Sequence, residues 1–175
     1  MKTYKTALIS LFILSIFISC EDEEKSPDQK ITDEIIGKWY LSEYSSYQSI
    51  AEESGNYFQI GGAIDYSIEF NDNPKVIFLD GELNYLGGAI TQDDTISTSG
   101  SIDGNLNQGP HTGKWKIKNE NLVTKTRVFG LIGEIELITE ILEINSDSML
   151  LKIDQSQYSS DELTHVGEIS LKYKR

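Results

Sequence analysis

Apolar and polar residues alternate along most of the chain after residue 34. The alternation is clearest in segments 65–70 and 169–173, where every second side chain is apolar. A period of two is typical of strands that bury one face and expose the other. No long segment repeats with the period of an α-helix, and only segment 47–53 indicates a short helix. The pattern therefore predicts an all-β domain.

Turn residues divide this domain into eight or nine strands. Asn71–Pro74 is one predicted turn, and Asp80-Gly81 is a typical hairpin dipeptide. The apolar phase of the longest strand shifts near Ile138, which indicates a β-bulge or strong coiling. Many short strands with tight turns predict an antiparallel barrel or a sandwich, and closure into a barrel would remove exposed edges. The expected strands are 35–41, 65–70, 75–79, 82–90, 114–118, 122–129, 134–144, 149–153 and 169–173.

The N-terminus has the layout of a secretory signal. Lys2 and Lys5 are followed by the apolar segment 7–18, which two serines interrupt. A bilayer-spanning helix needs about 20 apolar residues, so this segment is short for a permanent span. We therefore expect residues 1–19 to be a signal peptide helix that is not part of the fold.

Cys20 is the only cysteine, and it follows the apolar segment directly. The sequence Phe17-Ile18-Ser19-Cys20 resembles a bacterial lipobox, although Phe17 stands where leucine is usual. This resemblance implies that Cys20 is lipidated and becomes the new N-terminus. Several acyl chains hold a protein firmly to a membrane, because each buried methylene contributes about 0.8 kcal/mol.

Four acidic residues, 21–24, follow the cysteine. Such a run repels itself, so we expect residues 20–33 to form a flexible acidic tether. The run resembles the surface-export signal of lipoproteins of the Bacteroidetes type. That resemblance implies an outer membrane lipoprotein on the cell surface, whereas a plain solvated spacer would leave it facing the periplasm.

The charge excludes several classes of function. The chain has a formal net charge of −13, and segment 39–113 contains a single basic residue, Lys75, against 11 acidic ones. Nucleic acid is not an expected partner, since phosphate binding requires a basic surface. The only histidines are His111, which we place in a loop, and His165, which we place in a strand. No catalytic or metal-binding motif is present, so we expect neither an enzyme nor a metal or other cofactor.

Residues 34–175 resemble a lipocalin-like domain. Gly37-Lys38-Trp39 resembles the opening strand of that family, and Gly113-Lys114-Trp115 repeats the motif in a middle strand. The resemblance implies an antiparallel lipocalin-like (calycin) barrel of eight or nine strands, with Gly37 and Trp39 at its closed floor. A basic residue packs over the tryptophan in classical lipocalins, and Lys172 and Arg175 are the candidates here.

Two functions remain open. The first is binding of a small apolar or amphipathic ligand in or at the mouth of the barrel. We expect the connection 45–64 to cover that mouth, where Tyr47, Tyr57 and Phe58, together with Tyr66, either contact the ligand or pack the cover itself. The second is a filled barrel that docks another cell-envelope protein through acidic loops. Bulky side chains at alternating positions 66–70 and at Val76 and Phe78 favour a filled interior.

Overall fold

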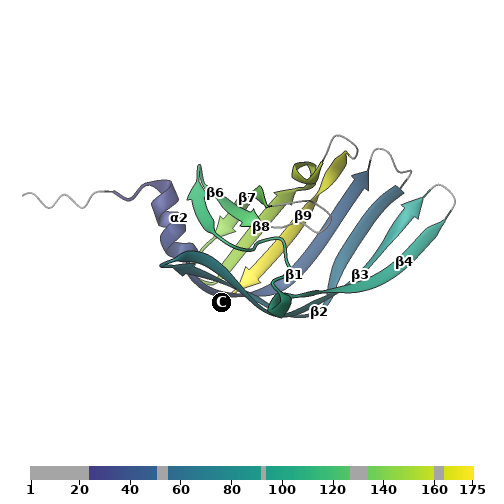
Figure 1. Ribbon diagram of the computed structural model, residues 1–175, viewed down its shortest axis with the longest axis horizontal. Coiled ribbons are helices and arrows are strands. Elements are labelled where there is room, and N and C mark those ends of the chain that lie inside the picture. Colours follow the sequence, from purple (N-terminus) through teal and green to yellow (C-terminus); the bar gives the residue numbers. More distant parts are fainter. Residues whose placement is uncertain (1–23, 51–54, 92–93, 127–133, 160–163) are drawn as a thin grey trace, which may run out of the picture.

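One antiparallel sheet of nine strands makes up most of the fold, in the order β4-β3-β2-β1-β9-β8-β7-β6-β5 (Figure 1). The computed structural model describes residues 24–50, 55–91, 94–126, 134–159 and 164–175. The predicted all-β antiparallel class is confirmed. The edge strands do not form a continuous ladder in this part of the chain, so barrel closure remains a prediction. The strands are β1 (Gly37–Ile50), β2 (Gly55–Asp72), β3 (Lys75–Thr91), β4 (Thr95–Asp103), β5 (Trp115–Lys118), β6 (Asn121–Thr126), β7 (Ile135–Ile144), β8 (Ser148–Asp154) and β9 (His165–Lys174).

A helix, α2 (Pro27–Ile35), precedes the sheet and packs against its end. Ser26 caps it by accepting a hydrogen bond from the Gln29 amide, and a proline begins the first turn. The Asp28 carboxylate accepts hydrogen bonds from the amides of Asn119 and Glu120, at 3.1 and 2.7 Å. The tether predicted over residues 20–33 is therefore ordered from Pro27 onward. The Ser-Pro-Asp start is the sequence signal that indicates this helix.

Three predicted boundaries are wrong because β1, β2 and β3 are longer than expected. Segment 45–64 is not a covering loop, since 45–50 belongs to β1 and 55–64 belongs to β2. The short helix predicted at 47–53 is strand over 47–50, and the rest lies outside the described residues. Asp80-Gly81 lies inside β3 rather than in a hairpin turn. In β7, where a bulge or strong coiling is predicted near Ile138, the register shifts between Ile141 and Glu143.

The sheet has two unlike ends. We call the end covered by α2 the helix end and the opposite end of β1, β2 and β3 the far end (Figure 1). β1, β2 and β3 contain 14, 18 and 17 residues and run the whole distance. β5 and β6 contain only four and six residues and lie at the helix end. In the described chain the far end is therefore built from β4, β3, β2, β1 and β9.

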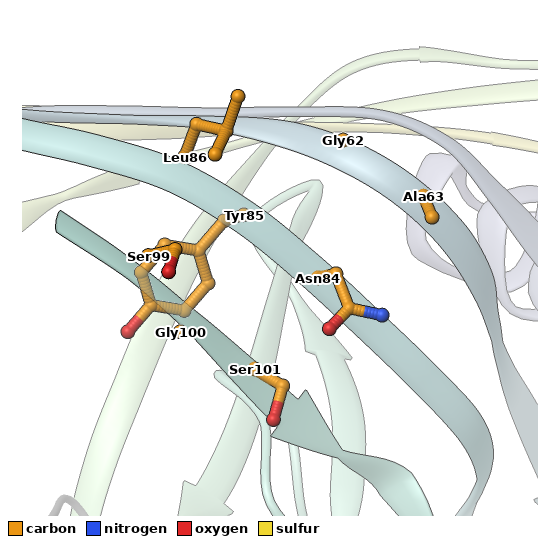
Figure 2. Close-up of a pocket in the computed structure, with 8 residues that line it drawn as sticks. All are labelled: Gly62, Ala63, Asn84, Tyr85, Leu86, Ser99, Gly100 and Ser101. Carbon is orange, nitrogen blue, oxygen red and sulfur yellow. The ribbon is translucent and has the colours of Figure 1, made fainter.

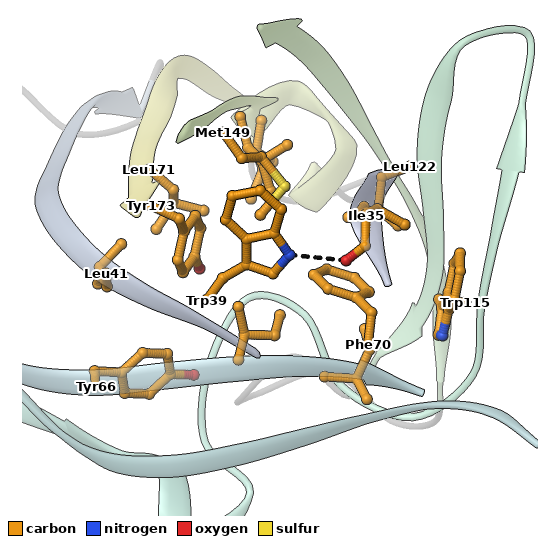
Figure 3. Close-up of a cluster of buried hydrophobic side chains, with 14 of the residues drawn as sticks. Ile35, Trp39, Leu41, Tyr66, Phe70, Trp115, Leu122, Met149, Leu171 and Tyr173 are labelled. Atoms are coloured by element: carbon orange, nitrogen blue, oxygen red, sulfur yellow. Dashed lines mark hydrogen bonds between the residues drawn. The ribbon is translucent and has the colours of Figure 1, made fainter. Parts of the chain in front are cut away.

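The hydrophobic core fills the helix end (Figure 3). We call the sheet face that carries it the inner face. Trp39 is fully buried near its centre, and its ring nitrogen donates a 2.8 Å hydrogen bond to the Ile35 carbonyl. Burying each large apolar side chain contributes about 1.5–3 kcal/mol. In β3 the side chains of Ile77 and Leu79 point toward the core. Phe78, which is predicted to lie inside, is exposed because it lies on the other face, opposite Glu69.

Arg175 is the basic residue that packs over Trp39. Its guanidinium lies 4.3 Å from the ring centroid. It also donates hydrogen bonds to the carbonyls of Glu34 and Ile36, at 2.6 and 2.8 Å. Lys172, the other candidate, pairs with Glu43 instead. Gly37, between the helix and Trp39, has a φ of +115°, which favours glycine.

The second Gly-Lys-Trp motif contacts the ends of β2 and β3 at the helix end. The Trp115 ring nitrogen donates to the Asn71 carbonyl at 2.9 Å, and Lys75 lies 4.8 Å from the ring centroid. Lys114 forms an isolated bridge with Val76 of β3. Its carbonyl also accepts from the Lys125 amide of β6, at 3.0 Å. The residues before β5 therefore connect β3 with β6.

We predict that Arg175→Ala lowers the free energy of unfolding by about 2 kcal/mol. The change removes a cation–π contact and the charged donor of two backbone carbonyls. Urea denaturation of the variant and the wild type measures the difference. Lys174→Ala, at the exposed neighbouring position, is the control and should cost less than about 0.5 kcal/mol. Equal effects of the two substitutions would contradict the anchoring role of Arg175.

Candidate functional site

Small residues occupy many inner positions at the far end, where the strands have no second layer of described strands across from them. Strand register places them on the inner face, because each lies opposite or between inward side chains. A tyrosine- and glutamine-rich surface lies between these small residues. The small inner residues are Ser46, Gly61, Gly87, Ala89, Gly100 and Gly167.

Two tyrosines lie against this surface. Tyr85 of β3 packs across Gly100 of β4, so closely that a Cβ at position 100 would lie 2.4 Å from the Tyr85 hydroxyl oxygen. Tyr44 of β1 lies 6.5 Å from Tyr85, measured between ring centroids, at an interplanar angle of 46°. Glycine at position 100 thus allows an aromatic ring to lie along the sheet instead of standing upright.

Tyr44 of this pair is held in place by a hydrogen bond. The Tyr44 hydroxyl donates to Gln59 Oε1 at 2.6 Å. Burial, and then the neighbouring Tyr85, raise the pKa of Tyr44 to about 12. Tyr44 therefore remains a neutral donor at physiological pH. Tyr85 and Gln59 are half-buried, so part of each contacts solvent.

Gln155 fixes the neighbouring wall of this surface. Gln155, buried in the 3₁₀ turn η3 (Gln155–Tyr158), donates from Nε2 to Ser46 Oγ at 2.9 Å, and it lies within 3.1 and 3.2 Å of the carbonyls of Tyr47 and Glu168. Gln48 and His165 also contact each other through their side chains across β1 and β9. These contacts join β1, β9 and η3 into one support for the tyrosine pair.

The arrangement suits binding rather than catalysis. It offers aromatic faces, amides and hydroxyl groups, which stack on flat apolar groups and hydrogen-bond with polar ones. In the described part of the chain, no three His, Cys, Asp or Glu side chains are grouped so as to hold a metal ion.

The four tyrosine and phenylalanine positions predicted from sequence do not form one site. Tyr57 lies on the inner face, opposite Gln48. Tyr47 and Phe58 lie opposite each other on the outer face. Tyr66 is in the core, 4% exposed, and its hydroxyl donates to the Gln108 carbonyl at 3.0 Å. Cys20, the predicted lipidation site, lies outside the described residues.

Two β-bulges explain the misplaced residues. In β1 the register shifts between Leu41 and Glu43. In β2 the register shifts between Gly61 and Ile64. A one-residue shift moves every following side chain to the opposite face. Strict alternation from Trp39 puts Tyr47 inside and Tyr44 outside, whereas the structure has the reverse.

A groove of about 480 Å³ lies on the outer side of the same three strands, β2, β3 and β4 (Figure 2). The side chains of Asn84, Leu86, Ser99 and Ser101 line it, all from outward positions, because Tyr85 and Gly100 are inward. Gly62 and Ala63, in the β2 bulge, complete the lining. Tyr85 and Gly100 also line the groove, so it borders the tyrosine pair.

His111 is a buried polar residue, although its sequence position predicts an ordinary loop residue. It lies in the loop before β5 as expected, but it is only 1% exposed. Neither ring nitrogen has a hydrogen-bond partner among the described residues. Burial lowers the pKa of His111 to about 3, so the ring is neutral in the folded protein at physiological pH.

Comparisons with known proteins assign no family. No family model matches the chain, and no curated protein matches it. In the described residues no helix is long and apolar enough to span a bilayer.

We predict that His111 makes the protein less stable as the pH falls from 6.5 toward 3. The unfolded ring has a pKa of about 6.5 and takes up a proton that the folded ring refuses, so unfolding is favoured below that pH. The free energy of unfolding, measured in urea, should fall with a slope approaching 1.4 kcal/mol per pH unit from this residue.

The variant His111→Leu removes this slope, and its difference from the wild type isolates the contribution of His111 from that of the carboxylates. His165→Asn removes the other histidine while keeping His111, and should show the wild-type slope. If wild type and His111→Leu share the same pH profile, the buried ring is not the cause.

Proposed function

We propose that the protein is a membrane-anchored, lipocalin-like lipoprotein that binds a small amphipathic molecule at the far end of its inner face. The observation that carries the proposal is the pair Tyr44 and Tyr85, held along the sheet by Gly100 and Gln59. Tyr44 is buried, at 7% exposed, and supports the half-buried Tyr85, whose ring can contact a flat apolar group while the neighbouring amides orient polar ones.

The distribution of large and small side chains favours a ligand site at the mouth of the proposed barrel over one in its interior. The core fills the helix end with large side chains, including Trp39, Phe70 and Tyr173. Small inner residues are concentrated at the far end. A ligand site at the far end fits both observations. The high acidic charge of segment 39–113 favours an uncharged or cationic ligand over an anionic one.

Lipocalin-like closure is supported at the helix end. Gly37-Lys38-Trp39 opens β1, with Arg175 over the tryptophan ring, as the family resemblance implies. The Val76–Lys114 bridge links the two sides of the sheet there. We propose a barrel that is closed at the helix end and open at the far end.

Acylation at Cys20 would place the helix end next to the membrane. Seven residue steps separate Cys20 from Pro27, where α2 begins. At about 3.3–3.6 Å per residue they reach at most roughly 25 Å. The far end is the part of the sheet most distant from α2, so the ligand site would face away from the anchoring bilayer (Figure 1).

We predict that Cys20→Ser abolishes acylation. Cells labelled with radioactive palmitate should show label on the wild-type protein and none on the variant, and only the wild type should sediment with membranes. Ser19→Ala keeps a small residue before the cysteine and is the control that should remain labelled. Membrane association of an unlabelled Cys20→Ser chain would contradict lipid anchoring.

We predict that the chain carrying Cys20→Ser binds the neutral amphipathic probe N-phenyl-1-naphthylamine in a saturable way. Tyr85→Ala should weaken binding about fivefold, because a lost aromatic contact costs about 1 kcal/mol. Leu86→Ala, the next residue on the outer face, should leave the dissociation constant unchanged. Fluorescence titration measures both. Equal affinities of the two variants, or no saturable binding, would exclude the inner-face site.

A further inference from the structure

One edge of the sheet is an unprotected strand. β4 (Thr95–Asp103) pairs with β3 along one side, and it is the end strand of the sheet order. In the described residues no strand pairs with its other side. An edge of this kind presents a row of backbone donors and acceptors to a further strand.

The hydrogen bonds between Gln108 and Asp103 show which backbone groups face the free edge. The Asp103 amide donates to Gln108 Oε1 at 3.1 Å, and the Gln108 amide donates to the Asp103 carbonyl at 3.0 Å. Asp103 therefore points away from β3, and Gln108 covers that end of the edge. Backbone groups in an antiparallel strand alternate between its two sides. The amides and carbonyls of Ser97, Ser99 and Ser101 thus point to the free edge.

β4 lacks the features that normally protect edge strands. Charged side chains, especially lysine, prolines and bulges keep exposed edges from pairing. Residues 95–102 read Thr-Ile-Ser-Thr-Ser-Gly-Ser-Ile and contain no charged side chain and no proline. The pairing of β3 with β4 has no bulge. The strand is also mostly exposed. Its sequence thus leaves the edge able to pair.

The charge beside the edge indicates what kind of strand would pair with it. Asp65, Glu82 and Asp103 lie directly opposite one another in register across β2, β3 and β4. All three are on the outer face, and like charges placed in this way repel one another. A lysine or arginine on an added strand would relieve that repulsion. A second copy of this acidic chain would increase it.

An apolar contact is available on the same side. Ile60 and Leu86 lie opposite each other on the outer face, 58% and 66% exposed. Leu86 also lines the groove beside Ser99 and Ser101 (Figure 2). An outward side chain of an added strand would lie over this groove.

We propose that the free edge of β4 docks an extended, basic segment of a partner protein as a tenth strand. Backbone hydrogen bonds to Ser97, Ser99 and Ser101 supply the affinity. The acidic row and the outer groove supply the preference for basic and apolar side chains. The docking edge adjoins the proposed ligand site, because Tyr85 and Gly100 also line the outer groove.

Hydrogen exchange and peptide binding test this docking edge on the chain carrying Cys20→Ser. The probe is a blocked nine-residue peptide of alternating threonine and valine with a lysine near each end. Without it, the amides of Ser97, Ser99 and Ser101 should exchange at least tenfold faster than those of Thr98 and Gly100, which point toward β3. Saturating peptide should slow the three serine amides at least tenfold. A peptide with glutamates in place of the lysines should bind at least tenfold more weakly.

Ser99→Pro removes one edge amide that the β3 ladder does not use, and a proline is tolerated on an edge of this kind. It should weaken binding of the lysine peptide at least tenfold, whereas Ser99→Ala should not. Ser97→Pro is the second variant if Ser99→Pro does not fold. Glu82→Gln should reduce the preference for lysine over glutamate.

Three results would overturn the proposal. Slow exchange of the three serine amides in the monomer without peptide would show that the chain covers its own edge. Equal binding of the lysine peptide by Ser99→Pro and Ser99→Ala would show that the edge is not used. A dimer in sedimentation velocity that Ser99→Pro dissociates would assign the edge to a second copy.

Discussion

The stacking of Arg175 on Trp39 connects the parts of this molecule that are most distant in sequence. The indole ring is buried at the start of β1 and donates to the last residue of α2. The guanidinium comes from beyond the end of β9 and binds the carbonyls on both sides of the helix C-terminus. One cation and one ring therefore hold the helix, the first strand and the last strand together. β1 and β9 are neighbours at the centre of the sheet, so this contact lies where its two halves meet.

Alternation predicted the fold class well, because the core positions of short strands follow a strict period of two. Ile169, Leu171 and Tyr173, for example, face the core as the pattern indicates. The packing of a basic residue over Trp39 was also expected, from the resemblance of Gly37-Lys38-Trp39 to the opening strand of lipocalin-like domains. The bridge between Val76 and Lys114 could not be derived, because these residues are 38 positions apart in the sequence.

The sequence does not show which side chains lie on the inner face of the far end, and the β-bulges are the physical reason. A bulge adds one residue to a strand and reverses the face of every side chain beyond it. Serines, glycines and tyrosines near the two bulges carry no pattern that marks the position of the extra residue. Tyr44 and Gln59 thus exchanged faces with Tyr47 and Phe58 relative to strict alternation. Gly61 and Gly62 at the second bulge were the one local signal, because glycine inside a strand often marks a bulge.

Because the strands differ in length, we do not expect the two ends of the sheet to unfold as one cooperative unit. The long hairpin of β2 and β3 continues beyond the strands that enclose the core, so its outer half is stabilised chiefly by its own ladder and by β1 and β4. Opening of that half would expose few of the buried apolar side chains, which lie mainly at the helix end. On this basis we expect that half to be a separate unit of lower local stability, which unfolds and refolds while the rest remains native. The helix end, which stays folded, thereby serves as a template on which the far end re-forms.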